Sequence, residues 1–98
     1  MEIKNNAMAG TMESSDILIA IEPNPDKEIA IELKSSVEKQ FGDQIKKVIM
    51  DTLLELNVES AVIRVNDKGA LDCVIKSRVQ AAVLRAAGEM HFNWEVEK

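Results

Sequence analysis

Two short runs, the β-branched 17–22 and the alternating 27–34, lie on either side of two prolines and limit the fold to few possibilities. The first run is too short for a helix, and the second alternates apolar and charged side chains with the period of two that is typical of a half-buried strand. Pro23 and Pro25 lack a backbone N–H donor and disfavour helix in the residue before them, so they end the first run. We therefore expect two strands that pair antiparallel across the proline turn.

One long amphipathic helix is expected over 36–56. Its start, Ser35 to Glu38, has the pattern of a capping box, in which a serine hydroxyl accepts from a backbone N–H and the glutamate reaches back to the cap. Gly42 costs about 1 kcal/mol relative to alanine inside a helix, so a break there, with Asp43 capping a second segment, stays open. The apolar stripe of this helix comprises Val37, Phe41, Ile45, Val48, Ile49, Leu53 and Leu56.

The second half of the chain predicts two strands and a shorter helix. The strands are expected at 61–65 and 71–75, joined by a hairpin turn at 66–69 whose glycine suits a left-handed conformation. Within 71–75 the alternation places Cys73 on the apolar face, as a small core residue. The alanine-rich run 77–87 then predicts a helix that ends at a glycine.

These elements predict an α+β fold: a single domain in which an antiparallel four-stranded sheet carries two helices, in the order ββαββα. Residues 1–15 lack periodicity and are expected to form a flexible N-terminal arm that includes a polar loop, while 16–98 form the domain. The aromatic tail with His91, Phe92 and Trp94 is expected either to dock on this domain or to meet a partner.

Composition excludes several classes of function. The formal charge of -5, without a basic stripe, argues against nucleic-acid binding, which needs clustered Lys and Arg. The single cysteine cannot form an internal disulfide, and the sequence has neither a signal-peptide pattern nor about 18 consecutive apolar residues, the length that could span a membrane. We therefore expect a cytoplasmic protein that binds neither nucleic acid nor a membrane.

The chain does not predict an active site of its own. One histidine and one cysteine cannot build an ordinary zinc site, and a catalytic pair of Cys73 and His91 would have to bring opposite ends of the domain together. The four scattered glycines match no phosphate-binding loop. We therefore expect no catalytic residue and no metal site, with His91 as a solvated residue.

The segment 10–16, with two adjacent serines, is the place where chemistry is expected to begin. By itself it has the composition of a surface loop, and serine pairs beside an acid are most often turn or cap residues. A serine on an exposed loop of a small acidic domain is also what a carrier protein needs, because its hydroxyl can take a prosthetic group that supplies the chemistry.

Three blocks resemble the acyl carrier (gamma) subunits of citrate lyases, and they occur in the order that this family shows. The blocks are 9–16 (AGTMESSD), 36–43 (SVEKQFGD) and 67–73 (DKGALDC). The resemblance implies that 2'-(5''-phosphoribosyl)-3'-dephospho-CoA is attached through a phosphodiester to a serine, and by position in the Thr-x-Glu-Ser-x-Asp motif that serine corresponds to Ser14. The terminal thiol of the group would carry acetyl and then citryl groups.

The same resemblance implies the partners. They are the citrate lyase alpha subunit, which exchanges acetyl for citryl, the beta subunit, which cleaves citryl to oxaloacetate, and a transferase that attaches the prosthetic group. The chain itself would be a non-catalytic carrier. Two other hypotheses about the function stay open. The chain could be the carrier subunit of malonate decarboxylase, which uses the same type of group, or an unmodified assembly subunit. A small hydrolase with Ser14 as nucleophile lacks a histidine nearby in the sequence.

Overall fold

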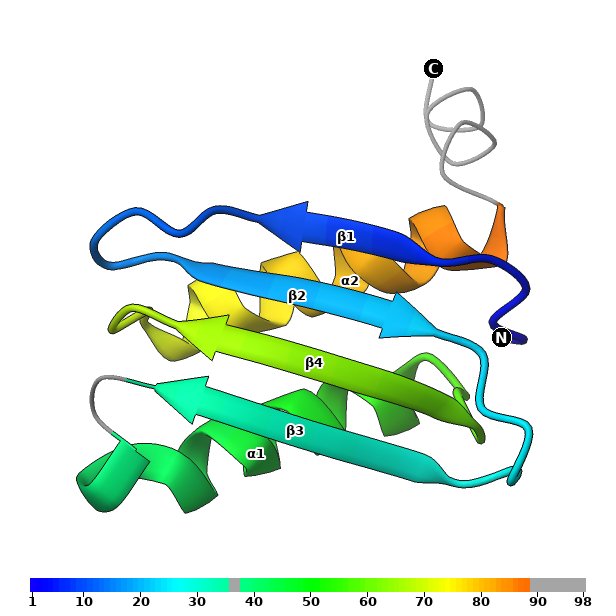
Figure 1. The fold of residues 1–98 in the computed structure, drawn as a ribbon, viewed down its shortest axis with the longest axis horizontal. Coiled ribbons are helices and arrows are strands. Elements are labelled where there is room, and N and C mark those ends of the chain that lie inside the picture. The colour runs from blue at the N-terminus through cyan, green and yellow to red at the C-terminus, as the bar shows by residue number, and fades with distance from the viewer. Residues whose placement is uncertain (36–37, 89–98) are drawn as a thin grey trace.

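A four-stranded sheet with two helices packed on one of its faces makes up the fold (Figure 1). The structure is a computed structural model that describes residues 1–35 and 38–88. The elements are β1 (Ala7–Gly10), β2 (Ile17–Glu22), β3 (Ile29–Ser35), α1 (Glu38–Glu55), β4 (Ala61–Asp67) and α2 (Asp72–Ala87). The expected single α+β domain with four strands and two helices is confirmed, but the element order is βββαβα.

The sheet is mixed rather than antiparallel. Its strand order is β1-β2-β4-β3; the pairs β1–β2 and β2–β4 are antiparallel, whereas β3 and β4 are parallel. The expected antiparallel pair of 17–22 with 27–34 is therefore wrong, because β4 lies between them. Two neighbouring parallel strands need a crossover of a dozen residues or more, and α1 supplies that crossover from β3 to β4.

Strand β1 lies inside the segment 1–15 that we expected to be a flexible arm. Its sequence, AMAG, has little strand propensity, but its backbone pairs with β2 from Ala7–Ile21 to Gly10–Leu18. Before the strand, Ile3 is buried in the core. The division of the chain into an arm and a domain at residue 16 stays a prediction, but residues 7–10 belong to the sheet.

The strand expected at 71–75 is wrong, since these residues begin helix α2. The alternation of Leu71, Cys73 and Ile75 covered only a few residues. A longer stripe, in which Ile75 and Val79 continue the helical spacing of the alanine-rich run, determines the structure. Cys73 is consequently exposed on the helix and is not a core residue. The glycine of the preceding turn, Gly69, does have the expected left-handed conformation, with φ of +90°.

Helix α1 runs without a break through Gly42, so the expected alternative of two segments is wrong. Its buried face follows the predicted stripe at Ile45, Ile49 and Leu53, but Phe41 at the start of that stripe is 50% exposed. Ser36 and Val37 of the predicted capping box lie outside the described residues, whereas Ser35 ends β3 and its hydroxyl donates to the Asp67 carboxylate at 2.8 Å. The hydrophobic core between the helices and the sheet includes Ile17, Ile19, Ile21, Ile45, Ile49, Leu53, Ile63, Val65, Ile75, Val79 and Val83.

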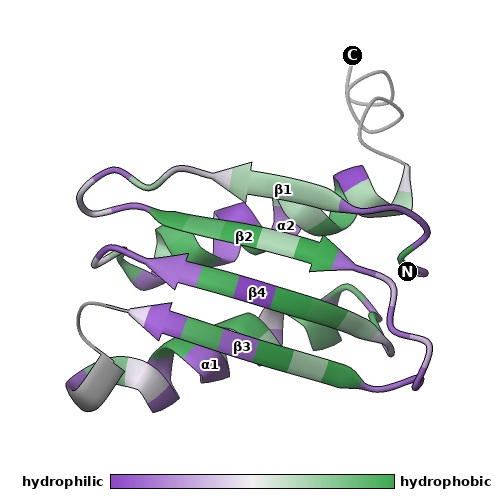
Figure 2. Ribbon diagram, viewed as in Figure 1, coloured by the Kyte–Doolittle hydropathy of each residue, from purple (hydrophilic) through white to green (hydrophobic). Residues whose placement is uncertain are grey.

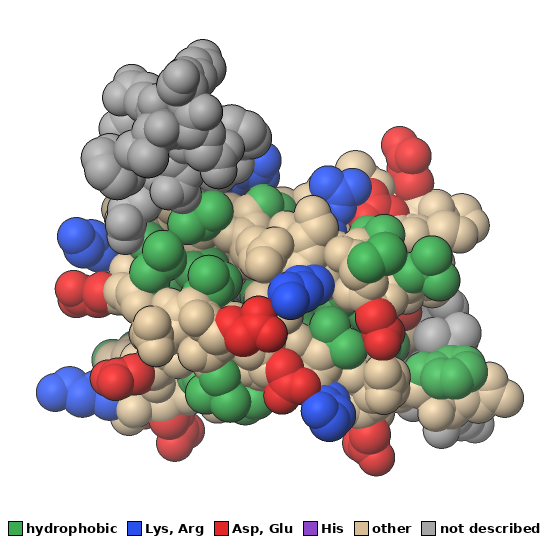
Figure 3. All heavy atoms as spheres, turned by 180° about the vertical axis from the view of Figure 1, so that it is seen from behind, with side chains coloured by type: hydrophobic (Ala, Val, Ile, Leu, Met, Phe, Trp, Pro, Cys, Tyr) green, Lys and Arg blue, Asp and Glu red, His purple; other side chains and the backbone are tan. Residues whose placement is uncertain are grey.

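Strand β2 is hydrophobic along nearly its whole length, whereas β3 and β4 carry charged residues among hydrophobic ones (Figure 2). On the face of the sheet opposite the helices, Arg64 of β4 forms ion pairs with Glu22 of β2 at 2.8 Å and with Glu32 of β3 at 2.9 Å. These charges join three strands across the uncovered face. On the helical face, hydrophobic side chains lie in separate patches among charged ones (Figure 3).

Truncation of Ile49 tests the shared core. Ile49 is fully buried, so Ile49→Ala should lower the free energy of unfolding by about 2–5 kcal/mol through lost burial and the cavity left behind. Leu54→Ala on the same helix is the matched control, because Leu54 is 60% exposed and should change stability by about 0.5 kcal/mol at most. Denaturant melts measure both variants, and a loss below about half a kcal/mol for Ile49→Ala would contradict the described core.

Candidate functional site

The candidate site is the serine loop, defined here as residues 11–16, which joins β1 to β2 at one end of the sheet (Figure 1). The Asp16 N–H donates to the Glu13 carbonyl at 3.2 Å and closes a tight turn that contains both serines. Met12, Glu13, Ser14 and Ser15 are all exposed. The loop therefore presents its serines to solvent from a turn of defined shape.

Asp16 anchors the loop through its carboxylate. The carboxylate accepts hydrogen bonds from the Thr11 hydroxyl at 2.7 Å and from the Ile17 N–H at 2.7 Å. The Arg78 guanidinium, which extends from α2, donates to both carboxylate oxygens, at 3.1 and 2.9 Å. Such a bidentate pair fixes geometry as well as charge. The Arg78 hydrogen bonds, followed by those from Thr11 and Ile17, lower the pKa of Asp16 from 3.8 to about 2.

The backbone on the far side of the turn is tied to the end of β4. The Ser15 N–H donates to the Lys68 carbonyl at 2.8 Å, and the Lys68 N–H donates to the Asp16 carbonyl at 2.9 Å. These bonds continue the β2–β4 pairing, which ends at Ile17 and Asp67. Ser15 also adopts a left-handed backbone with φ of +66°, which is uncommon for a residue with a side chain.

Gly10 sets the entrance to the loop. Its φ is +95°, and a Cβ at this position would lie 1.8 Å from the carbonyl oxygen of Ile17. A side chain therefore cannot be accommodated without moving the backbone of β2. The glycine allows β1 to approach β2 closely at the point where the chain turns into the loop.

The two serines differ in backbone environment more than in exposure. Within residues 1–35 and 38–88, neither the Ser14 nor the Ser15 hydroxyl has a hydrogen-bond partner. The Ser15 backbone N–H is bonded to Lys68, just after β4, whereas its hydroxyl extends from the same turn to solvent. Ser14 lies one residue further from that attachment. Its assignment as the modified residue stays a prediction.

Sequence reasoning missed Arg78 as part of the site. It is 62 residues from Asp16, and an arginine in a helical stretch gives no local signal of such a contact. The charge of Asp16, which lies beside the serines in the sequence, is paired with Arg78 at 2.9 Å. Glu13 is then the unpaired acid next to Ser14 among the described residues.

Other candidate chemistry does not gather around the loop. Cys73 is exposed in the first turn of α2, and His91 lies outside the described residues. In the described part of the chain no three His, Cys, Asp or Glu side chains are placed to hold a metal ion. Within that part, too, neither helix has the length and apolar character needed to cross a membrane.

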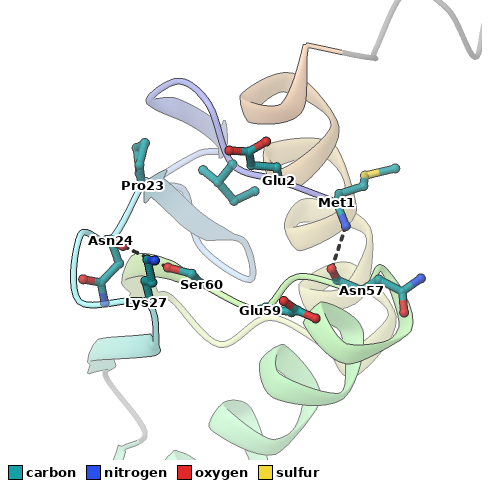
Figure 4. Close-up of a pocket in the computed structure, with 9 residues that line it drawn as sticks. Met1, Glu2, Pro23, Asn24, Lys27, Asn57, Glu59 and Ser60 are labelled. Carbon is teal, nitrogen blue, oxygen red and sulfur yellow. Dashed lines mark hydrogen bonds between the residues drawn. The ribbon is translucent and has the colours of Figure 1, made fainter.

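A hollow of about 590 Å³ lies at the opposite end of the molecule, between the N-terminal residues and the turn that follows β2 (Figure 4). Two of its polar groups are engaged within the fold: the Met1 ammonium donates to the Asn57 carbonyl at 2.6 Å, and the Ser60 hydroxyl donates to the Asn24 carbonyl at 2.9 Å. This hollow is remote from the serines and offers them no chemistry.

The pH dependence of the free energy of unfolding tests whether Asp16 anchors the serine loop. The folded-state pKa of Asp16 lies below its ordinary value, so the contribution of this carboxylate to stability is fully present above pH 3.8 and is lost as the pH falls towards about 2. Asp16→Asn should therefore be less stable at neutral pH and should lose less stability than the parent between pH 3.8 and 2. Denaturant melts over this pH range measure both effects.

Asp51→Asn is the control, because Asp51 forms an exposed ion pair with Lys47 on α1 at 2.8 Å and should matter little. The same pH dependence in Asp16→Asn and the parent would contradict the anchoring role.

Comparison with known proteins identifies the family. The family model for the acyl carrier protein described as malonate decarboxylase delta subunit (MdcD) matches residues 4–86. The citrate lyase acyl carrier protein of Streptococcus equi subsp. equi (strain 4047) is 58% identical over 97% of this chain and 93% of its own length. Those of Lacticaseibacillus casei (strain BL23) and Clostridium perfringens (strain 13 / Type A) are 56% and 53% identical, over 97% and 96% of this chain and 93% of each relative.

A solved structure shares the fold. It is a Pseudomonas malonate decarboxylase hetero-tetramer in complex with malonate, one chain of which superposes with a TM-score of 0.68 and 18% identity over 86% of both chains. At this identity the likeness concerns the fold alone. The sequence relatives carry the further conclusion: this chain belongs to the family of citrate lyase acyl carrier proteins.

Proposed function

We propose that the protein is the acyl carrier subunit of a citrate lyase and that it carries 2'-(5''-phosphoribosyl)-3'-dephospho-CoA covalently on Ser14. The observation that carries this proposal is the 58% identity, over nearly the whole chain, to a protein named citrate lyase acyl carrier protein. When bound, this group supplies a terminal thiol that holds acyl groups as thioesters. The chain itself is a non-catalytic carrier in this proposal.

The geometry of the serine loop fits such an attachment. Ser14 is exposed on a turn, and its hydroxyl has no hydrogen-bond partner among residues 1–35 and 38–88. The turn is held from one side by the Asp16–Arg78 pair and from the other by β4, so a transferase meets a loop of fixed shape. A preformed loop reduces the entropy that recognition must overcome.

The charge around Ser14 affects how a donor that carries phosphates can approach. Because Arg78 pairs with Asp16, that carboxylate opposes an anionic donor less than its place in the sequence suggests. Glu13 remains as an acid beside Ser14. The transferase must therefore bring its own cations or a metal ion to the reaction, since no group of metal-ligating side chains is present in the described part of the chain.

The proposal implies three partners: the alpha and beta subunits of citrate lyase and the transferase. The carrier subunit of malonate decarboxylase is the second candidate, supported by the description of the matching family model and by the shared fold. The matching chain of the malonate decarboxylase structure is 18% identical to this chain, whereas the citrate lyase relative is 58% identical, and this difference favours the citrate lyase proposal. Identification of the acyl group on the native thiol, acetyl or malonyl, separates the two.

The proposal is tested first by the intact mass of the native protein. A mass increment equal to the prosthetic group is expected. An unmodified chain within a functional complex would overturn the proposal and favour an unmodified assembly subunit. Turnover of a substrate by the purified chain alone would instead favour a hydrolase.

Substitution of the neighbouring serines tests the attachment residue. Ser14→Ala should leave the free energy of unfolding unchanged within about 0.5 kcal/mol, as for other surface substitutions, while the prosthetic mass increment and the lyase activity of the reconstituted complex are lost. Ser15→Ala is the matched control and should keep both, because the Ser15 backbone bond to Lys68 does not involve its side chain. Tandem mass spectrometry that maps the group to Ser15 would contradict the assignment.

Substitution of Cys73 tests whether the working thiol belongs to the prosthetic group. Cys73 is exposed, so Cys73→Ser should fold normally, and acyl transfer in the reconstituted complex should stay within about twofold of the parent, a difference below about 0.5 kcal/mol. The measurement is acetyl loading and citrate cleavage at equal protein concentration. Loss of transfer in a variant with an unchanged denaturant midpoint would show that the chain's own thiol takes part.

A further inference from the structure

A groove of about 370 Å³ opens at the end of the molecule that carries the serine loop, between the start of α1 and the turn that leads from β4 into α2. Its lining includes Phe41, Gln44 and Ile45 of α1 and, from the turn and the first residue of α2, Ala70, Leu71 and Asp72. We name it the Phe41–Leu71 groove.

The two apolar residues at its mouth do little for the fold. Phe41 is 50% exposed although the stripe of α1 would place it in the core. Leu71 is 71% exposed and occupies the N-cap of α2, where it makes no side-chain capping bond. Ser, Thr, Asp or Asn is preferred at that position. Residues that conflict with local preference in this way are typical of a functional surface.

The serine loop is hydrogen-bonded to the turn that contributes to the groove. The Ser15 N–H donates to the Lys68 carbonyl at 2.8 Å, and Lys68 lies between Asp67 and Gly69, which both line the groove. A group attached to Ser14 therefore starts next to Ser15, the residue that is bonded to this turn. Because it belongs to the same molecule and starts near the groove, the attached group is the occupant that we consider.

The charges and polarity of the residues that line the groove indicate which part of the prosthetic group it can bind. Among the described residues that line the groove none is basic, and Asp67 and Asp72 both contribute carboxylates. Asp67 already accepts from the Ser35 hydroxyl at 2.8 Å and from the Ala70 N–H at 3.0 Å. Phosphates and a citryl group are anionic and are disfavoured here. A neutral part with a flat apolar face and hydrogen-bond donors is favoured.

Adenine has these properties, and it lies nearer the serine than the pantetheine part does, because the added phosphoribosyl unit joins the serine to the adenosine ribose. Its face can stack on the exposed Phe41 ring, as nucleobases do on aromatic side chains. Its exocyclic amine can donate to Asp72, whose carboxylate is at the surface and accepts from the Gln44 amide at 2.9 Å. The pantetheine part is also neutral, but it lies beyond the diphosphate.

On these grounds we propose that the Phe41–Leu71 groove binds the adenine base of the prosthetic group attached to Ser14. This proposal rests on the proposed function. Binding near the root fixes the first part of the group and leaves the thiol end to move between partner enzymes. The groove thus sets the direction in which the group leaves the carrier.

Nuclear magnetic resonance of the isotope-labelled protein with its group attached tests the proposal. We expect nuclear Overhauser contacts between the adenine protons and the Phe41 ring, together with ring-current shifts of the adenine signals. Phe41→Ala should lower the ratio of docked to free base about fivefold or more, as the usual strength of base–aromatic stacking implies. Leu71→Ala should lower the ratio as well, whereas Phe41→Trp should retain docking.

The matched control is Leu54→Ala, which removes an exposed apolar side chain of α1 that does not line the groove and should leave the ratio unchanged. Contacts from the pantetheine part instead, or no contact in a protein whose intact mass shows the group, would overturn this inference and leave the proposed function standing. An intact mass without the group would overturn the proposed function and this inference with it.

Discussion

Pairing of β4 on both of its edges is the constraint on which the rest of the structure depends. Its backbone bonds antiparallel to β2, with Ile19 opposite Val65, and parallel to β3, with Ile31 opposite Ile63. The parallel pair requires α1 as a crossover, and the end of β4 leads through a short turn into α2. Both helices therefore begin at the end of the sheet where the serine loop lies (Figure 1).

Much of the fold could be predicted from the sequence because its strongest signals are local. The β-branched run of β2, the alternation in β3 and the three- and four-residue spacing in α1 all reflect burial within one element. Strand partners could not be predicted in this way, since β2 and β3 are adjacent in sequence but separated by β4. Strand β1 was missed because backbone pairing with β2, and not side-chain preference, forms it.

For the site, too, features set by neighbouring residues could be predicted, whereas contacts between residues far apart in the sequence could not. A polar loop with adjacent serines could be recognised from composition, and the resemblance supplied the choice of Ser14. The contacts that hold the loop come from Arg78 and Lys68, both more than 50 residues away, and neither carries a signal in its own neighbourhood. Phe41 illustrates the opposite case: its spacing indicated a core residue, yet it lies in the first turn of α1 and is half exposed.

The loop has a fixed entrance and exit and an exposed tip. Gly10 allows no side chain at the entrance, and Asp16 secures the exit, while Met12, Glu13 and Ser14 are exposed between them. Changes at the tip therefore act on recognition by a modifying enzyme without passing through the core. The tip can therefore be exchanged for a short acceptor peptide that a different transferase recognises, and the sheet would hold that peptide at the same position.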